Sequence, residues 1–174
     1  MKLNSEARLE LFDEAKHLHL VDPLTELLHA AYAPLAAQGL KYGAAYQLAA
    51  KTLERLKEGE SYLVFDCEQL IGTVTLSAEN PVGSCEYYKR RGVYSFGQFA
   101  IHPSTQGKGL GSAVMDYLEK RAADVGATEL ALDTSEHAHD LIRMYKKRGY
   151  QIVAHTQWDT TNYRSVIMSK DLKK

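Results

Sequence analysis

Three glycines, Gly107, Gly109 and Gly111, alternate along a short stretch of the 174-residue chain. Glycine has no side chain to keep a ligand away from the backbone, and it adopts positive φ angles at little cost. Residues 112–125 then place apolar side chains at helical intervals, so the glycines precede a predicted helix. The free N–H groups and positive dipole end of a helix N-terminus bind anions, phosphate and pyrophosphate above all. Lys108 adds a positive charge.

Two other glycine motifs fit this stretch poorly. A P-loop requires Gly-x-x-x-x-Gly-Lys followed by Ser or Thr, whereas Lys108 is followed by Gly109. A dinucleotide-binding fingerprint requires a third glycine where Ser112 stands and a turn directly at the strand end, whereas residues 102–106 intervene. An ordinary glycine-rich turn is the remaining alternative, because a glycine cluster alone is a weak signal.

The sequence around the glycines is more specific. A strand-like segment ends in Phe99-Ala-Ile-His-Pro103 and is followed by Gln106-Gly-Lys-Gly-Leu-Gly111 and then by the amphipathic helix. This order and spacing resemble the acetyl-CoA-binding segment of the Gcn5-related N-acetyltransferase (GNAT) superfamily. Further along, Tyr145-Lys-Lys-Arg-Gly-Tyr150 resembles the family's Tyr-x-x-x-Gly-Phe/Tyr element.

The resemblance implies a binding site for acetyl-CoA as co-substrate and no metal. The main-chain amides of residues 106–112 would hold the CoA pyrophosphate, and the main chain of Phe99 and Ile101 would pair with the pantetheine arm. The cofactor-binding residues implied in this way are Phe99, Ala100, Ile101, Gln106, Gly107, Lys108, Gly109, Leu110, Gly111 and Ser112.

Acetyl transfer also needs an unprotonated amine and a group that protonates the leaving sulfur. A free alkyl amine has a pKa near ~10, so it must lose a proton before it attacks. The resemblance implies Tyr145 as the general acid, although spacing alone favours a buried aromatic residue on an apolar face. Main-chain N–H groups near Phe99 and Ala100 would meet the developing negative charge. The base stays open between Glu86 or Asp133, the nearest acids in sequence, and a chain of water molecules.

Two parts of the sequence depart from the family pattern. Ala138 stands where many relatives carry an Asn that contacts the CoA arm. We expect the acceptor pocket to be formed by the segments that match the family pattern least, and these segments are rich in aromatic side chains. These side chains pack into cores more often than they bind ligands; they are Tyr32, Tyr42, Tyr46, Tyr87, Tyr88, Trp158 and Tyr163, with Asn162 beside them.

Composition narrows the class of protein. The formal net charge of −1 argues against nucleic acid or an anionic membrane as the partner. Cys67 and Cys85 are poorly placed for a zinc site, and residues 1–7 lack the apolar core of a signal peptide. No segment approaches the ~18 apolar residues of a membrane span. These features predict a cytoplasmic protein with free thiols.

Hydrophobic periodicity and turn residues give an order of elements. We expect strands at 7–11, 61–66, 70–76, 93–101, 128–133, 150–156 and 163–169, although the continuation of the first strand, 12–20, fits a helix equally well. We expect helices from Asp22, as the N-cap before Pro23, up to Gly39, and at 44–57, 112–125 and 137–148. In the second of these, Leu48, Leu53 and Leu56 should face inward. A strand, a helix and a strand on either side of the glycine turn predict a parallel pair with a right-handed crossover.

This order predicts an α/β fold with a GNAT-type mixed, mostly antiparallel sheet, about four flanking helices and a parallel pair that splays at the cofactor site. The length fits one domain, 1–174. The family pattern covers 60–172 best, and 1–59 supply an N-terminal strand and two helices.

The sequence therefore predicts an acyl-CoA-dependent N-acetyltransferase that acts on a primary amine of a small molecule or peptide by direct attack in a ternary complex. A homodimer is possible. The alternative is a non-catalytic CoA-binding or interaction module.

Overall fold

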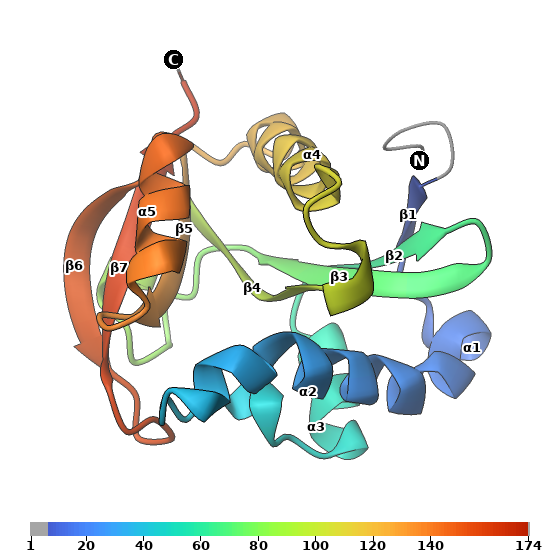
Figure 1. Cartoon of the computed structure of the whole chain (residues 1–174). Coiled ribbons are helices and arrows are strands. Elements are labelled where there is room, and N and C mark those ends of the chain that lie inside the picture. Colours follow the sequence, from blue (N-terminus) through green and yellow to red (C-terminus); the bar gives the residue numbers. More distant parts are fainter. Residues whose placement is uncertain (1–6, 174) are drawn as a thin grey trace.

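The computed structural model describes residues 7–173, and its centre is a seven-stranded sheet with the strand order β1-β2-β3-β4-β5-β7-β6 (Figure 1). The strands are β1 Ala7–Leu11, β2 Glu60–Asp66, β3 Gln69–Ser77, β4 Val93–Ile101, β5 Glu129–Ser135, β6 Gln151–Gln157 and β7 Arg164–Asp171. The helices are α1 Glu14–His17, α2 Val21–Ala37, α3 Ala49–Leu56, α4 Leu110–Asp124 and α5 His139–Lys147.

The first four strands form an antiparallel meander. β1 pairs with β2, β2 with β3, and β3 with β4. The predicted hairpin connection between β2 and β3 is confirmed, and Cys67 takes a positive φ of 51° in the tight turn. β1 is confirmed as a strand. The helix considered for 12–20 is confirmed in part, since α1 lies within that range.

The predicted parallel pair is β4 and β5, and it is short. Its register runs only from Val93 opposite Glu129 to Ser95 opposite Ala131. All other neighbouring strands are antiparallel. The expected mixed sheet with one splayed parallel pair is therefore confirmed. Within residues 7–173, the remaining length of β4 has no strand partner on its β5 side.

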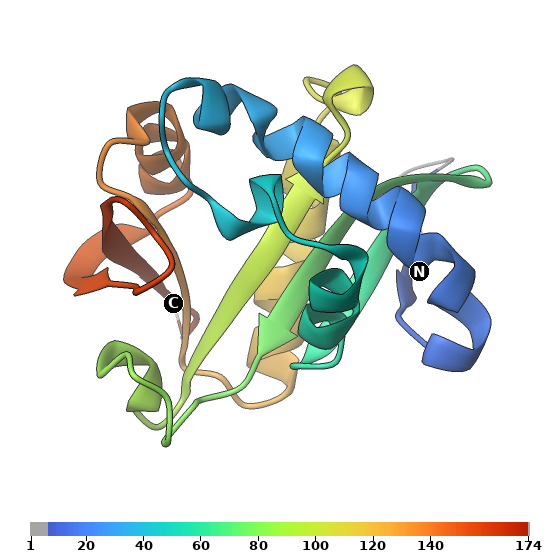
Figure 2. The same ribbon diagram turned by 90° about the horizontal axis from the view of Figure 1, so that it is seen from below.

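Helices cover both faces of the sheet. On one face α4 packs through Val114, Met115 and Leu118 against apolar strand residues, and Tyr145 of α5 joins the same cluster. On the other face α2 contributes Leu24 and Leu28. Figure 1 shows α2 and α3 below the sheet, and Figure 2, seen from below, shows both helices in front of it. The sheet is buried by apolar surface from both sides, which is the main source of folding free energy.

Two details of the N-terminal helices differ from the prediction. Asp22 is not the N-cap of α2, because a 3-10 turn at Leu18–Leu20 runs straight into the helix and places Asp22 in its first turn. Pro23 is tolerated there because the first turn needs no N–H bonds.

The helix expected over 44–57 is interrupted. A 3-10 turn at Gly43–Ala45 precedes α3, and Leu48 lies between them in an extended conformation as the N-cap. Leu48 is therefore 78% exposed instead of facing inward. The interruption lets the Gln47 side chain turn inward and donate hydrogen bonds to Thr52 and Gln98.

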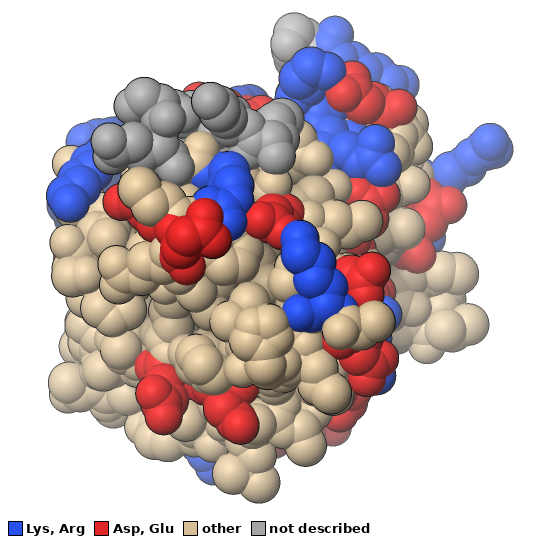
Figure 3. Space-filling model, turned by 90° about the vertical axis from the view of Figure 1, so that its right-hand side faces the viewer, with Lys and Arg blue, Asp and Glu red and all other residues tan. Residues whose placement is uncertain are grey.

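Charged side chains of both signs are interspersed on the β1 edge of the molecule (Figure 3). Glu10 accepts hydrogen bonds from Arg8 at 2.9 Å and from Lys16 at 2.6 Å. These two bonds, of which that from Lys16 has the larger effect, lower the pKa of Glu10 from 4.5 to about 2.

No helix within residues 7–173 is long and apolar enough to cross a membrane.

The lowered pKa of Glu10 predicts how stability depends on pH. A carboxylate whose pKa is depressed on folding stabilises the protein above its unfolded pKa, and that contribution fades as the pH falls from 4.5 toward 2. Because the pair is partly exposed, we expect Glu10→Gln to lower the unfolding free energy at pH 7 by about 0.5 to 1 kcal/mol.

Denaturant unfolding at pH 7 and at pH 3 measures this effect. The gap between wild type and Glu10→Gln should narrow at the lower pH. Glu26→Gln removes an exposed carboxylate that makes no ion pair with the described residues, and it serves as the control. An equal gap at both pH values would contradict the assignment.

Candidate active site

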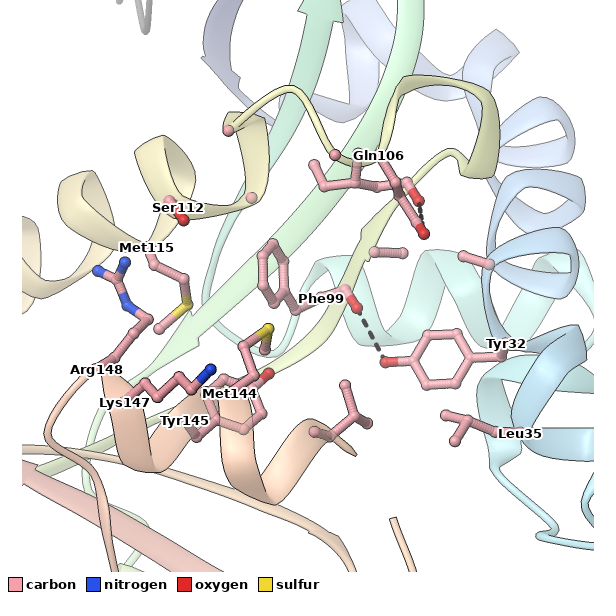
Figure 4. Close-up of a pocket in the computed structure, with 17 residues that line it drawn as sticks. Tyr32, Leu35, Phe99, Gln106, Ser112, Met115, Met144, Tyr145, Lys147 and Arg148 are labelled. Carbon is pink, nitrogen blue, oxygen red and sulfur yellow. Dashed lines mark hydrogen bonds between the residues drawn. The ribbon is translucent and has the colours of Figure 1, made fainter. Parts of the chain in front are cut away.

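One cavity of about 620 Å³ brings together the glycine turn, the second half of β4 and the helices α2 and α5 (Figure 4). Most of the residues expected to bind acetyl-CoA line it, together with the expected general acid. They are Phe99, Ala100, Ile101, Gln106, Gly107, Gly109, Gly111, Ser112 and Tyr145. Segments that are far apart in the sequence therefore meet at one site.

The glycine turn is held close to the end of β4. A 3-10 turn at Pro103–Thr105 reverses the chain, and the Gln106 side-chain amide donates a hydrogen bond of 2.9 Å to the carbonyl oxygen of Ile101. Gly107 and Gly109 follow with φ angles of 78° and 77°. These left-handed conformations are costly for residues with a Cβ, which explains the glycines in physical terms.

Gly109 is also the N-cap of α4, and no side chain of the described residues caps this end of the helix. The N–H groups of the first turn have no partner within a helix. Because Gly109, Gly111 and Ser112 line the cavity, these donors and the positive end of the helix dipole lie at its wall.

The edge of β4 forms a second wall. Pairing with β5 stops at Ser95, and a bulge interrupts the pairing with β3 where Gln98 has a φ of 48°. The bulge turns the main chain around Phe99 away from a regular ladder. The Phe99 carbonyl oxygen accepts a hydrogen bond of 3.0 Å from the Tyr32 hydroxyl of α2, on the cavity side seen in Figure 4.

Tyr145 is both a core residue and a cavity residue. It is 6% exposed and packs edge-on against Phe96 and Tyr150, with ring centroids 6.1 and 5.8 Å away. Its hydroxyl makes no hydrogen bond to residues 7–173. Burial raises the pKa of Tyr145 above its ordinary value of 10.0, so the hydroxyl stays protonated at neutral pH.

Two of the expected binding residues do not line the cavity. Lys108 is exposed at the tip of the turn, and the Leu110 side chain is buried in the core below α4. Leu110 can contribute only its main-chain N–H, whereas Lys108 is free to reach a ligand from outside.

The cavity also contains residues that sequence reasoning missed. They come mainly from α2 and from the outer face of α5, and they are Ala31, Leu35, Met115, Leu141, Met144, Lys147 and Arg148. The half-exposed Leu141 and Met144 on α5 were a possible signal, because apolar residues three apart form a stripe on one helix face. Nothing in the sequence showed that α2 would lie opposite this stripe.

The two candidate bases lie in different surroundings. Glu86 is exposed and pairs with Lys89 at 2.5 Å. Asp133 on β5 accepts hydrogen bonds from the Tyr88 hydroxyl at 3.0 Å and the Trp158 indole N–H at 2.8 Å. Burial raises the pKa of Asp133 above 3.8, although both hydrogen bonds oppose this effect. Asp133 is therefore the candidate whose surroundings favour accepting a proton.

Several of the aromatic residues named from the sequence gather next to the cavity. Tyr42 packs between Tyr32 and Tyr163, with centroid distances of 5.5 and 5.0 Å. The Asn162 side chain bonds to Lys41 N–H and to Gly39 C=O, both at 2.8 Å, and ties the segment after α2 to the β6–β7 turn. Tyr46, in contrast, is 57% exposed and away from this cluster.

Comparisons with known proteins agree with this geometry. The sequence profile of the acetyltransferase (GNAT) family matches residues 23–150. A curated relative, S-(2-succino)cysteine N-acetyltransferase of Bacillus subtilis (strain 168), is 28% identical over 134 residues, which cover 74% of this chain and 77% of the relative.

Two solved structures resemble the fold at low sequence identity. The ribosomal-protein-S18-alanine N-acetyltransferase of Escherichia coli has a TM-score of 0.70 at 11% identity, covering 97% of this chain and 95% of the other. An aminoglycoside 6'-N-acetyltransferase complexed with coenzyme A has a TM-score of 0.65 at 19% identity, covering 96% and 98%. At these identities the likeness concerns the fold alone.

The positive φ angle of Gly109 generates a prediction about stability. Gly109→Ala should lower the unfolding free energy by about 1 to 2 kcal/mol, because alanine is strained in the left-handed region. Gly111→Ala is the matched control. A Cβ there would meet Phe99 and Ile101 at ordinary distances of 3.8 and 3.9 Å, so stability should stay equal or rise by up to about 1 kcal/mol.

Urea unfolding of the two variants measures the difference. Equal stability of Gly109→Ala and Gly111→Ala would show that the turn does not hold the conformation described above.

Proposed function

The chain belongs to the acetyltransferase (GNAT) family, and on that basis we propose that it transfers an acetyl group from acetyl-CoA to a primary amine of a small molecule or peptide, by direct attack in a ternary complex. The family and the relatives named N-acetyltransferase make the chain an acyl-CoA-dependent N-acyltransferase. The acceptor and the roles of individual residues are our proposals.

One observation supports the proposal most. An uncapped helix N-terminus and an unpaired strand edge line the same cavity of about 620 Å³. The first suits a pyrophosphate and the second suits an amide-containing chain, because a strand edge offers N–H and C=O groups for pairing. CoA contains both parts, so these residues fit acetyl-CoA, whose thioester supplies the acetyl group.

We assign the main-chain N–H groups from Gln106 to Ser112 to the phosphates. Gly107 and Gly109 leave open space, since a Cβ built at either position meets no atom within 4 Å. Lys108 contributes its charge from the exposed tip of the turn. The main chain of Phe99, Ala100 and Ile101 pairs with the pantetheine arm.

The Tyr32 hydroxyl already uses one lone pair of the Phe99 carbonyl oxygen. A carbonyl oxygen has two lone pairs, so it can still accept a second hydrogen bond. Tyr32 thereby fixes the orientation of this carbonyl without blocking it.

We assign the proton donor to Tyr145. When the acceptor nitrogen bonds to the acetyl carbon and the carbon–sulfur bond breaks, the sulfur takes the proton of the Tyr145 hydroxyl. The proton released by the nitrogen returns the hydroxyl to its starting state through solvent. Because burial raises the pKa of the Tyr145 phenol, its proton is in place at neutral pH when the carbon–sulfur bond breaks.

Relatives that act on amines support an amine acceptor. Their names mention an S-(2-succino)cysteine, an alanine of a ribosomal protein and aminoglycosides. These acceptors share an amino group and differ in everything else, so the family alone leaves the class of acceptor open.

The assignment of Tyr145 predicts a selective loss. Tyr145→Phe should lower kcat by about 100-fold or more, since a proton donor is removed, while acetyl-CoA affinity stays near wild type. Tyr150→Phe removes a hydroxyl from the same aromatic cluster and is the matched control, with turnover close to wild type.

Steady-state thiol release and calorimetric titration with acetyl-CoA make the two measurements. Unchanged turnover in Tyr145→Phe would remove Tyr145 from the mechanism. Tight acetyl-CoA binding with no turnover on any amine, in the wild type, would favour the non-catalytic CoA-binding module.

The phosphate site predicts a charge effect on binding. Gly111→Glu should weaken acetyl-CoA binding by about 100-fold or more, because a carboxylate would stand beside the bound phosphates. Gly111→Gln has the same size without the charge, so it should lose markedly less. Calorimetry with acetyl-CoA, ATP and NAD on the wild type gives the reference. Preference for ATP or NAD would exclude the CoA assignment.

A further inference from the structure

The first half of β4 lies in the middle of the sheet, yet part of its surface is open. Ser95 and Gly97 are partly exposed although β4 lies between β3 and β5. A Cβ built at Gly97 would meet one atom within 4 Å, Nη2 of Arg55 at 3.7 Å. Figure 2 shows β4 crossing between α3 and the β6–β7 turn without a helix over this part. Open space therefore lies over Gly97, next to the Arg55 guanidinium.

Arg55 reaches this space from α3 without a carboxylate partner. Its Nη1 donates a hydrogen bond of 3.1 Å to Oε1 of Gln47, a buried neutral amide that also bonds to Gln98 at 3.0 Å. No ion pair within the described residues involves Arg55. Guanidinium has five donors in a fixed plane. The side chain is thus held in place by one bond while most of its donors are free of protein acceptors.

Asp133 borders the same space from β5. Ser95 lies opposite Ala131 in the parallel register, and residues two apart on a strand share a face. Gly97 and Asp133 therefore point to the same side of the sheet. Asp133 is held by two neutral donors, Tyr88 and Trp158, and it forms no ion pair with residues 7–173. The charge of Arg55 acts on Asp133, which agrees with their position across one gap.

A cation and an anion that are held apart by neutral partners can each pair with one end of a ligand that carries both charges. We propose that this space binds the acceptor, and that the acceptor is an amine that also carries a carboxylate, such as an amino acid or its derivative. The carboxylate pairs with the Arg55 guanidinium, and the amino end lies on the Asp133 side. This inference rests on the acetyl transfer proposed above and adds the class of acceptor.

The charges also discriminate against other amines. An acceptor with several amino groups and no carboxylate would bring a second positive charge toward Arg55, and like charges in a partly desolvated site repel. A carboxylate instead forms charge-assisted and often bidentate hydrogen bonds with Arg. The geometry thus favours a zwitterion over a polycation.

Acceptor selectivity tests this inference. Initial rates of thiol release from acetyl-CoA are measured with the proteinogenic L-amino acids, S-substituted cysteines and the carboxamide of each. The ammonium group of a carboxamide is more acidic than that of the parent amino acid, so more of the carboxamide is present as the free, reactive amine. Amine reactivity alone would therefore favour the carboxamides. We expect wild type to prefer the best acids over their amides by about 10-fold or more in kcat/KM.

Arg55→Gln should lower kcat/KM for the acids by about 10- to 100-fold and leave the amides close to wild type. Arg55→Lys keeps the charge without the planar fork and should fall in between. Lys57→Gln removes a positive charge from the C-cap of the same helix, where Lys57 pairs with Glu14, and is the control, with no change for either class. Thermal unfolding verifies that each variant is folded.

Trp158 supplies a readout that does not depend on turnover. It is the single tryptophan of the chain and donates its indole N–H to Asp133. Titration of the wild type with the best acid should change the Trp158 fluorescence. In Arg55→Gln the acid concentration that gives half of this change should be higher by about 10-fold or more.

The outcomes separate the two proposals. Preference for amides, use of only carboxylate-free amines, or an equal loss on both classes in Arg55→Gln would overturn the zwitterion site while acetyl transfer stands. If acetyl-CoA does not bind, the proposed function falls, and the Trp158 titration alone then decides whether Arg55 binds carboxylates.

Discussion

The site depends on the early end of the pairing between β4 and β5. Three residue pairs connect these strands, and beyond Ser95 the main chain of β4 has no strand partner on that side. Buried N–H and C=O groups without partners are costly, so such an edge must meet solvent, a side chain or a ligand. The bulge at Gln98 and the Tyr32 hydroxyl on the Phe99 carbonyl are two local responses to this constraint. The cavity opens where the strands diverge.

The two kinds of binding group at this site have different origins. The groups assigned to the donor are mostly main chain, from the glycine turn and from β4, and their identity follows from backbone geometry. The groups assigned to the acceptor are side chains, Arg55 and Asp133, held by neutral hydrogen-bond partners from separate segments. A backbone site changes little when side chains change, whereas a side-chain site can be altered one residue at a time. The same fold can therefore serve many acceptors.

The sequence predicted the backbone part of this arrangement well and the side-chain part poorly. Runs of β-branched residues and the glycines that end elements predicted the bounds of β2, β3, β4 and the turn before α4 to within a few residues, because those signals are local. Leu48 was expected inside and lies outside, since the inward turn of Gln47 is a tertiary effect. The position of Arg55 over Gly97 could not be read from the sequence, because it depends on how α3 packs across a sheet formed by strands much later in the chain.

The strand order has a consequence for biosynthesis. β7 follows β6 along the chain but lies between β5 and β6 in the sheet. When β6 leaves the ribosome, its neighbour β7 has not yet emerged, and β5 still presents an unpaired edge. An exposed edge of this kind can pair with other chains until the last strand emerges and covers it. Insertion of β7 then satisfies two strands in one step, which makes completion of the sheet a cooperative and late event.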